Sequence, residues 1–127
     1  MLNYRRVWLT GGWFLVGLVV YLSLTPHPPE PFSFPEADKL EHCIAYGSLS
    51  FWFCQIYIST RSRMFAMVLL IGLGVGLEYV QGWTGYRFFE VLDMVADGIG
   101  VFSGFLLTQT PMGRLFILIE RVLQQIL

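Results

Sequence analysis

The chain has 127 residues, of which 55% are hydrophobic, 17% aromatic and 13% charged. Soluble domains carry about a quarter charged residues, and a water-soluble chain this short would still expose much of its apolar surface. The aromatic content excludes a disordered chain, and eight basic against nine acidic residues exclude a nucleic-acid partner. We therefore predict one membrane domain covering residues 1–127.

Four apolar stretches approach the roughly 20 residues that a membrane-spanning helix needs. The first covers about 7–24, carries no charged residue and ends just before Pro26. The other three cover about 42–58, 64–80 and 91–107, and they are separated by charged residues and glycines. These stretches predict four transmembrane helices joined by short connections.

The tail, residues 111–127, has a different pattern. Leu118 and Val122 belong to its apolar side, whereas Arg114 and Arg121 gather on the other side. Such a pattern is typical of an amphipathic helix that lies along the membrane surface. The predicted fold class is therefore an all-α membrane protein with four transmembrane helices plus a C-terminal amphipathic helix.

Two alternatives to this arrangement can be weighed from the sequence. Buried helices of a soluble protein would need polar helices to cover them, and the chain has none to spare. A cleaved signal peptide would fit Arg5 and Arg6 before an apolar run, but Ser23 to Pro26 lacks the small-residue pattern of a cleavage site. We therefore expect the first stretch to remain as a spanning helix.

The charged residues divide between the two sides of a four-helix topology. One side carries two basic against eight acidic residues, a net charge of −6, and the other carries six basic against one acidic, a net charge of +5. Basic residues in short loops are retained in the cytoplasm. Both termini are therefore expected to be cytoplasmic, together with the basic residues Arg5, Arg6, Arg61, Arg63, Arg114 and Arg121.

Polar residues recur near the acidic ends of the second, third and fourth stretches. Ionisable groups inside spanning helices are expensive and usually face a bundle interior or a water-filled cavity. Helical spacing places several of them on shared faces. The set consists of Asp38, Lys39, His42, Tyr46, Glu78, Gln81, Arg87, Glu90, Asp93 and Asp97.

Three interpretations of this set compete. In a structural network, Arg87 and Lys39 would neutralise carboxylates, and His42 would bond across helices. In a ligand or catalytic site, His42 would act as a general base oriented by Asp38 or Glu78, with Arg87 and Lys39 holding a phosphate or carboxylate. A metal site would use His42 with carboxylate oxygens, but a single histidine argues against it, and we assign no metal.

An ordered series of these residues resembles the VanZ-like family of small bacterial integral membrane proteins, named for a teicoplanin-resistance protein. The series runs from about residue 20 to residue 107, and one departure is Asp97, where the family pattern often has Asn. The resemblance implies a compact helical membrane domain at the cell envelope. Its parts are Ser23-Leu24-Thr25-Pro26, Asp38-Lys39-x-x-His42-x-x-x-Tyr46, Glu78-x-x-Gln81, Arg87 and Asp93-x-x-x-Asp97-x-x-Gly100-x-x-x-Gly104.

We expect a multi-pass protein of the bacterial inner membrane whose extracytoplasmic pocket binds or processes an envelope component. The expected ligand is a lipid headgroup or a glycopeptide-type antibiotic, the expected partners are membrane lipids, and no cofactor is assigned. Catalytic candidates are His42, Asp38, Glu78, Arg87 and Asp93, and ligand-binding candidates are Lys39, Tyr46, Gln81 and Asp97.

Two other functions are weighed against this one. In a structural or assembly protein, the polar cluster only locks the helix bundle. An ion or proton carrier would need a polar path across the bilayer, and we predict no ionisable residue in the cytoplasmic halves of the four helices.

Overall fold

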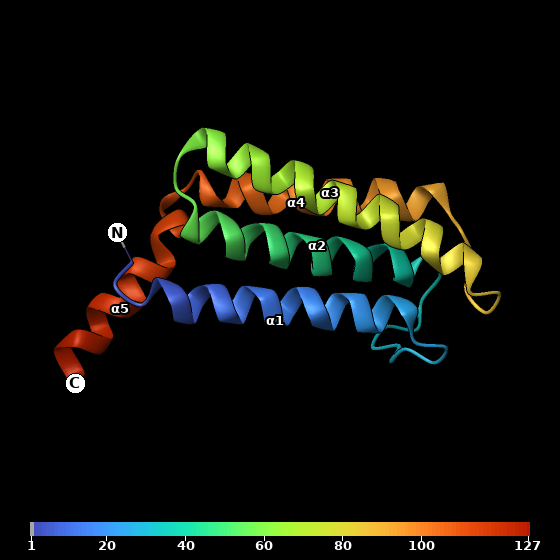
Figure 1. Ribbon diagram of the computed structural model, residues 1–127, viewed down its shortest axis with the longest axis horizontal. Coiled ribbons are helices and arrows are strands. Elements are labelled where there is room, and N and C mark those ends of the chain that lie inside the picture. Colours follow the sequence, from blue (N-terminus) through green and yellow to red (C-terminus); the bar gives the residue numbers. More distant parts are fainter. Residues whose placement is uncertain (1) are drawn as a thin grey trace.

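The computed structural model describes residues 2–127, which form five α-helices and one 3₁₀ turn without any strand (Figure 1). In chain order the elements are α1 (Arg5–Leu24), α2 (Ala37–Ile56), α3 (Thr60–Trp83), α4 (Val91–Thr108), the 3₁₀ turn η1 (Pro111–Arg114) and α5 (Leu115–Ile126). The all-helical prediction is confirmed.

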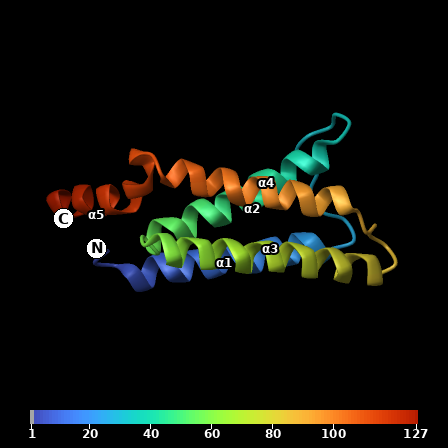
Figure 2. The same ribbon diagram turned by 90° about the horizontal axis from the view of Figure 1, so that it is seen from above.

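Helices α1 to α4 run alternately in opposite directions along the long axis of the molecule (Figure 1). Both termini and the turn between α2 and α3 lie at one end, and the connections 25–36 and 84–90 lie at the other. Seen from above, α1 and α3 lie on one side and α4 on the other, while α2 crosses between them (Figure 2). Most acidic residues of the chain therefore lie at one end of the bundle and most basic residues at the other.

Local sequence explains where the helices begin and end. Pro26 follows α1 closely and has no N–H with which to continue the helix. The hydroxyl of Ser59 accepts a hydrogen bond from the Ser62 N–H, 3.1 Å away, and so caps the start of α3. Gly85 lies just beyond α3 with φ of +80°, a left-handed conformation that suits glycine.

The two central helices, α2 and α4, approach one another backbone to backbone. A Cβ placed on Gly104 would overlap the carbonyl oxygen of Gly47, and one on Gly100 would overlap that of Cys43. Glycines spaced in this way allow close packing between helices in membranes. By contrast, a Cβ on Gly72 or Gly76 in α3 would meet no atom within 4 Å, so this second glycine pair does not pack inside the bundle.

The hydrophobic core forms where α2 meets α3 and α4. Its buried members are Tyr46, Leu49 and Phe53 of α2 with Leu70 of α3 and Val101 of α4. Helix α1 packs on the outside of this core through partly buried side chains, and Gly12 is the one buried residue of α1. The position of α2 at the centre brings its polar first turns against α4.

Three of the four predicted spanning helices have the length and apolar content that crossing a membrane requires. Helices α1, α3 and α4 are long and apolar enough to cross a membrane, but α2 does not reach the same apolar content. The predicted stretch 42–58 began too late, since α2 starts at Ala37 and includes Asp38, Lys39 and Glu41. Residue patterning missed this start because three charged residues near a proline-rich segment are more typical of a loop.

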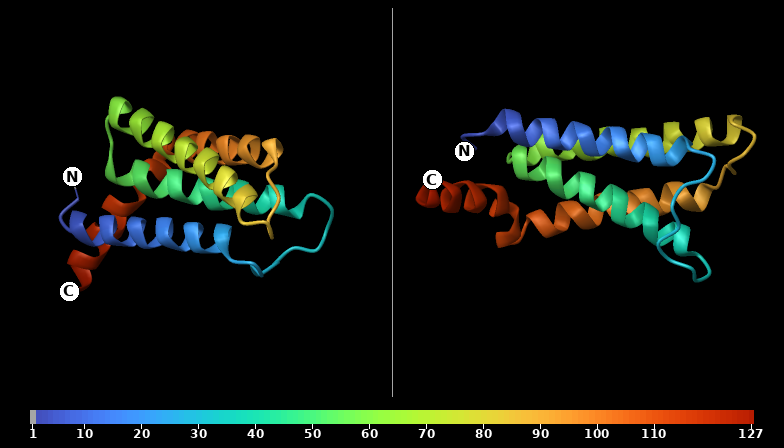
Figure 3. Two further views of the ribbon diagram at one scale, coloured as in Figure 1. Left: turned by 45° about the vertical axis from the view of Figure 1, so that its right-hand side comes forward. Right: turned by 90° about the horizontal axis from the view of Figure 1, so that it is seen from below.

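Helix α5 begins at Leu115, after η1, and leaves the bundle at an angle beside the N-terminus (Figure 3). Its Glu120 is 2% exposed and accepts hydrogen bonds from the Asn3 N–H at 2.7 Å, the Tyr4 N–H at 2.9 Å and the Trp8 indole at 2.8 Å. Burial opposes ionisation of Glu120, yet these donors together lower its carboxyl pKa below the usual value. The tail therefore holds the start of α1.

Candidate functional site

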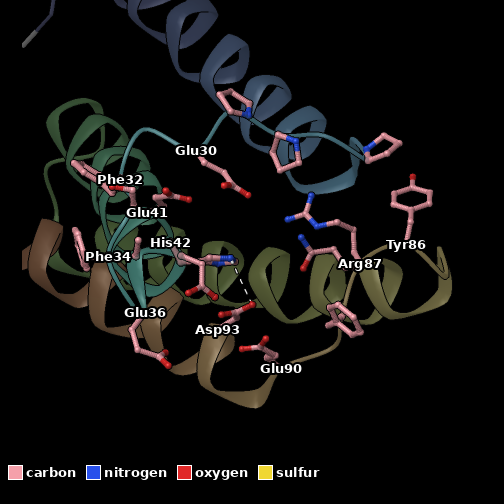
Figure 4. A pocket seen from close by; sticks show the side chains of 18 residues that line it. Glu30, Phe32, Phe34, Glu36, Glu41, His42, Tyr86, Arg87, Glu90 and Asp93 are labelled. Carbon is pink, nitrogen blue, oxygen red and sulfur yellow. Dashed lines mark ion pairs between the residues drawn. The ribbon is translucent and has the colours of Figure 1, made fainter.

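A cavity of about 480 Å³ opens at the end of the bundle that lies opposite the termini. It is lined by the proline-rich connection before α2, the first turns of α2, the end of α3, residues 86–90 and the first turn of α4. Figure 4 shows His42, Asp93 and Arg87 around this space, each from a different segment. A second cavity of about 420 Å³ shares His42 and Arg87 with it and continues between α1 and α2. We call the two together the end cavity.

Beside the end cavity, Lys39 forms ion pairs with three carboxylates. Its Nζ lies 2.7 Å from Asp38 Oδ2 and 2.6 Å from Asp93 Oδ1, and it also pairs with Glu90. The side chain of Asp93 is only 9% exposed, so this pair is largely shielded from water. One ammonium group faces three carboxylates, and the cluster therefore keeps a net negative charge.

The carboxylates of this cluster have a spacing that a metal ion could use. Oxygens of Asp38, Glu90 and Asp93 lie within 4.8 Å of one another, and hard cations prefer such ligands. The ammonium group of Lys39 already pairs with all three residues. The metal-site interpretation of the sequence placed His42 among the ligands, whereas this group consists of carboxylates alone.

His42 is held by a buried carboxylate on the facing helix. Its Nδ1 lies 2.6 Å from Oδ1 of Asp97, whose side chain is 3% exposed. With Asp97 ionised, Nδ1 would carry the proton and donate it, because a carboxylate only accepts hydrogen bonds. The other ring nitrogen, Nε2, lies 3.7 Å from Asp93 Oδ2 on the side of the end cavity. We call His42 and Asp97 the His–Asp pair.

A glycine in α3 makes room for this pair. A Cβ on Gly74 would lie 2.7 Å from Oδ2 of Asp97, too close for an ordinary contact. The carboxylate of Asp97 is therefore enclosed between α2, α3 and α4, which fixes the imidazole ring of His42. The sequence pattern predicted Asp38 or Glu78 as the orienting residue, and the structure assigns that position to Asp97.

Glu78 lies near the His–Asp pair but has a different partner. It is 1% exposed, and its Oε1 accepts a hydrogen bond from the Glu90 N–H, 2.8 Å away. That N–H belongs to the residue before α4, so Glu78 fixes the start of this helix against α3. A carboxylate near the first N–H groups of a helix is also favoured by the helix dipole.

Side chains from the end of α3 and the following loop close the last turn of α1. Gln81 Nε2 donates to the Ser23 carbonyl at 2.7 Å, and the Tyr86 hydroxyl donates to the Leu24 carbonyl at 2.7 Å. These carbonyl groups have no partner within the helix, and a bond from a side chain satisfies them.

Arg87 takes part in the same closure. Its Nη1 donates to the Leu22 carbonyl at 3.2 Å and the Thr25 carbonyl at 2.9 Å. The structural interpretation of the sequence had Arg87 neutralise a carboxylate, but among the residues that the structure describes it forms no ion pair. The guanidinium group instead lies between the end of α1 and the end cavity.

The structure thus brings most of the predicted residues together. Asp38, His42, Gln81, Arg87 and Asp93 line the end cavity directly. Tyr46 lines only its inner part and is 2% exposed within the core. Lys39, Glu78 and Asp97 lie behind the lining and hold other groups in place.

A set of buried polar residues lies at the opposite end of the bundle, and the sequence pattern did not indicate them. Arg63, predicted in a loop, lies in the first turn of α3 and is 7% exposed. Its Nε donates to the carbonyls of Cys54 at 2.9 Å and Tyr57 at 3.1 Å, and its Nη1 to that of Thr108 at 3.4 Å. Arg63 therefore satisfies carbonyl groups at the ends of α2 and α4. The prediction that the helix halves on the side of the termini hold no ionisable residue is wrong.

Sequence similarity to a known protein extends over 68% of this chain. No family model and no solved structure matches the chain. An uncharacterized protein of Schizosaccharomyces pombe is 32% identical over 92 residues, which are 68% of this chain and 54% of that protein. The chain spans about half the length of the curated relative that it matches.

These findings overturn the resemblance to the VanZ-like family. The matching relative is a eukaryotic protein, and no family model supports the assignment. The bacterial origin and the antibiotic-resistance role that followed from the resemblance are likewise without support. The individual motif pieces were short, and short polar motifs can agree with a family pattern by chance.

Proposed function

We propose that the protein binds the polar headgroup of a membrane lipid in the end cavity and that Nε2 of His42 forms a hydrogen bond with this ligand. The observation that carries the proposal is the His–Asp pair. A buried carboxylate fixes one ring nitrogen at 2.6 Å, while the other ring nitrogen lies beside an open cavity. A histidine ring held in this way presents its second nitrogen to a ligand in a fixed direction.

The aromatic residues around the mouth of the cavity support a lipid as the source of the ligand. Phe34 is 50% exposed, Tyr86 50% and Phe88 84%, and all three line the cavity. Trp83, at the end of α3, is 79% exposed. Aromatic side chains gather at the membrane–water interface, so the cavity would open at the level of the lipid headgroups.

This function includes a membrane arrangement in which α2 is a fourth crossing helix. The charges in its first turns lie at the bundle end, where Lys39 pairs with Asp38, Glu90 and Asp93. The basic end, with both termini, would face the cytoplasm, and the end cavity would open on the opposite side. Helix α5 would lie along the membrane surface, with Leu118 and Val122 towards the lipid.

The test is lipid binding by the full chain in dodecyl maltoside, a detergent without charge. We expect at least one member of a panel of dihexanoyl phosphatidylethanolamine, phosphatidylglycerol and phosphatidylserine to bind. His42→Gln should weaken this binding about tenfold or more, since a hydrogen bond to a charged group contributes that much. His27→Gln is the matched control, because His27 is exposed and does not line the cavity.

A structural protein is the second candidate, and a specific observation favours it. Lys39 pairs with carboxylates from two helices, and Arg87 donates a hydrogen bond to the carbonyl of Thr25 at the end of α1. Contacts of this kind hold the helices of the bundle together. In that case His42→Gln would lower thermal stability and membrane levels while no lipid of the panel binds the wild type. Normal stability with lost binding would support the binding site.

A further inference from the structure

The charges that line the end cavity are not balanced. Asp38, Glu90 and Asp93 pair with Lys39, as described above. Glu30 and Glu41 also line the cavity, and within residues 2–127 neither forms an ion pair. An acidic wall of this kind attracts a positively charged group and repels a purely anionic ligand.

Arg87 provides the opposite charge on another side of the same cavity. Its Nη1 is used by the carbonyls of Leu22 and Thr25, which hold the guanidinium group in place. Within the described part of the chain, Nε and Nη2 have no hydrogen-bond partner. An oriented guanidinium group with free N–H donors is well suited to bind a phosphate oxygen.

The two kinds of charge face one space. Figure 4 shows the carboxylates of Glu30 and Glu41 and the guanidinium group of Arg87 directed into the cavity from different segments, with His42 below them. A ligand with only a positive charge would be repelled by Arg87, and one with only negative charge by the acidic wall. A ligand that carries both charges satisfies both sides.

We propose that the end cavity selects a zwitterionic headgroup in which a phosphodiester contacts Arg87 and an ammonium group contacts Glu30 and Glu41. The proposal rests on the proposed function, because it names the class of headgroup that the site takes. The cavity of about 480 Å³ is within the range of small-molecule sites. The exposed aromatic ring of Phe88 at its mouth favours a lipid over the free phosphate ester.

The experiment measures the binding of four probes to the full chain in dodecyl maltoside. Dihexanoyl phosphatidylethanolamine carries both charges, dihexanoyl phosphatidylglycerol lacks the ammonium group, and a dihexanoyl trimethylammonium lipid lacks the phosphate. Free phosphoethanolamine has both charges but no lipid chains. We expect phosphatidylethanolamine to bind about tenfold or more tightly than each of the others, since each lacks a charge-assisted contact or the apolar one.

Substitutions test which residues contact the ammonium group and which contact the phosphodiester. Glu30→Gln combined with Glu41→Gln should remove the preference for phosphatidylethanolamine over phosphatidylglycerol, and the fold should persist because neither carboxylate has an ion-pair partner among residues 2–127. Arg87→Lys keeps the charge but loses the planar donors, and it should weaken both phospholipids. Arg61→Gln, an exposed change at the far end of the bundle, is the control for a charge change outside the cavity.

The outcomes separate this inference from the proposed function. Equal or tighter binding of phosphatidylglycerol that still depends on His42 would overturn the zwitterionic headgroup and leave the binding function standing. Unchanged preference in the double glutamine variant would also overturn it. Tight binding of free phosphoethanolamine would overturn the lipid source. Failure of every probe would overturn the zwitterionic headgroup, and failure of phosphatidylserine as well would overturn the proposed function.

Discussion

Replacing Gly104 by alanine tests the backbone contact that holds α2 against α4. A Cβ on Gly104 would overlap Gly47 O and come within 2.9 Å of Phe51 N, and both are backbone atoms of a helix that cannot rotate away. Overpacking of this kind costs about 1–3 kcal/mol. The end cavity should be disturbed as well, because the same two helices carry the His–Asp pair.

Gly72→Ala is the matched control, since a Cβ there meets no atom within 4 Å. Both substitutions gain the same helix propensity, up to about 1 kcal/mol. The difference between their free energies of unfolding therefore measures the backbone contact of Gly104 alone. The assay is unfolding by sodium dodecyl sulfate in mixed micelles, followed by circular dichroism. Equal stability of the two variants would refute the backbone contact as a source of stability.

Three further predictions concern the buried charges. Lys39→Met should destabilise the fold by about 3–5 kcal/mol, because it removes the ammonium partner of the largely buried Asp93 carboxylate, and adding Asp93→Asn should restore part of the loss in the same unfolding assay. Arg63→Met should loosen the ends of α2 and α4, seen as faster backbone hydrogen exchange there than at the end of α1. The lowered pKa of Glu120 contributes stability above the ordinary carboxyl value of about 4.3, and this is lost as pH falls through the lower folded value. Trp8 fluorescence should report this acid transition in the wild type and show none in Glu120→Gln.

Periodicity and charge were enough to predict an all-helical chain, three helices apolar enough to cross a membrane and the opposite charge of the two bundle ends. Long apolar stretches indicate spanning helices, because in lipid the backbone must satisfy its own hydrogen bonds and a helix does so within one segment. The same pattern failed for the start of α2, where charged residues are tolerated because Lys39 pairs with Asp93 of α4 and with Glu90 just before that helix. No local signal marks such a long-range pair.

The site was predicted as a group of residues, but the roles within it were not. Spacing placed His42 near Asp38 on one helix face, whereas its partner is Asp97, 55 residues later in the chain. Arg87 was expected to meet a carboxylate and instead closes the last turn of α1. Partners across helices depend on how the helices cross, and the sequence pattern does not specify that angle.

The central claim is that His42 is fixed by Asp97 on one side and faces a ligand cavity on the other. The chain has two histidines, so ¹⁵N-histidine NMR of the full protein in dodecyl maltoside resolves His42 with His27 as an internal reference. On addition of dihexanoyl phosphatidylethanolamine we expect the Nε2 signal of His42 to shift, while its hydrogen-bonded Nδ1–H and both His27 signals stay in place. An unchanged Nε2 signal of His42, or equal shifts at both histidines, would contradict the claim.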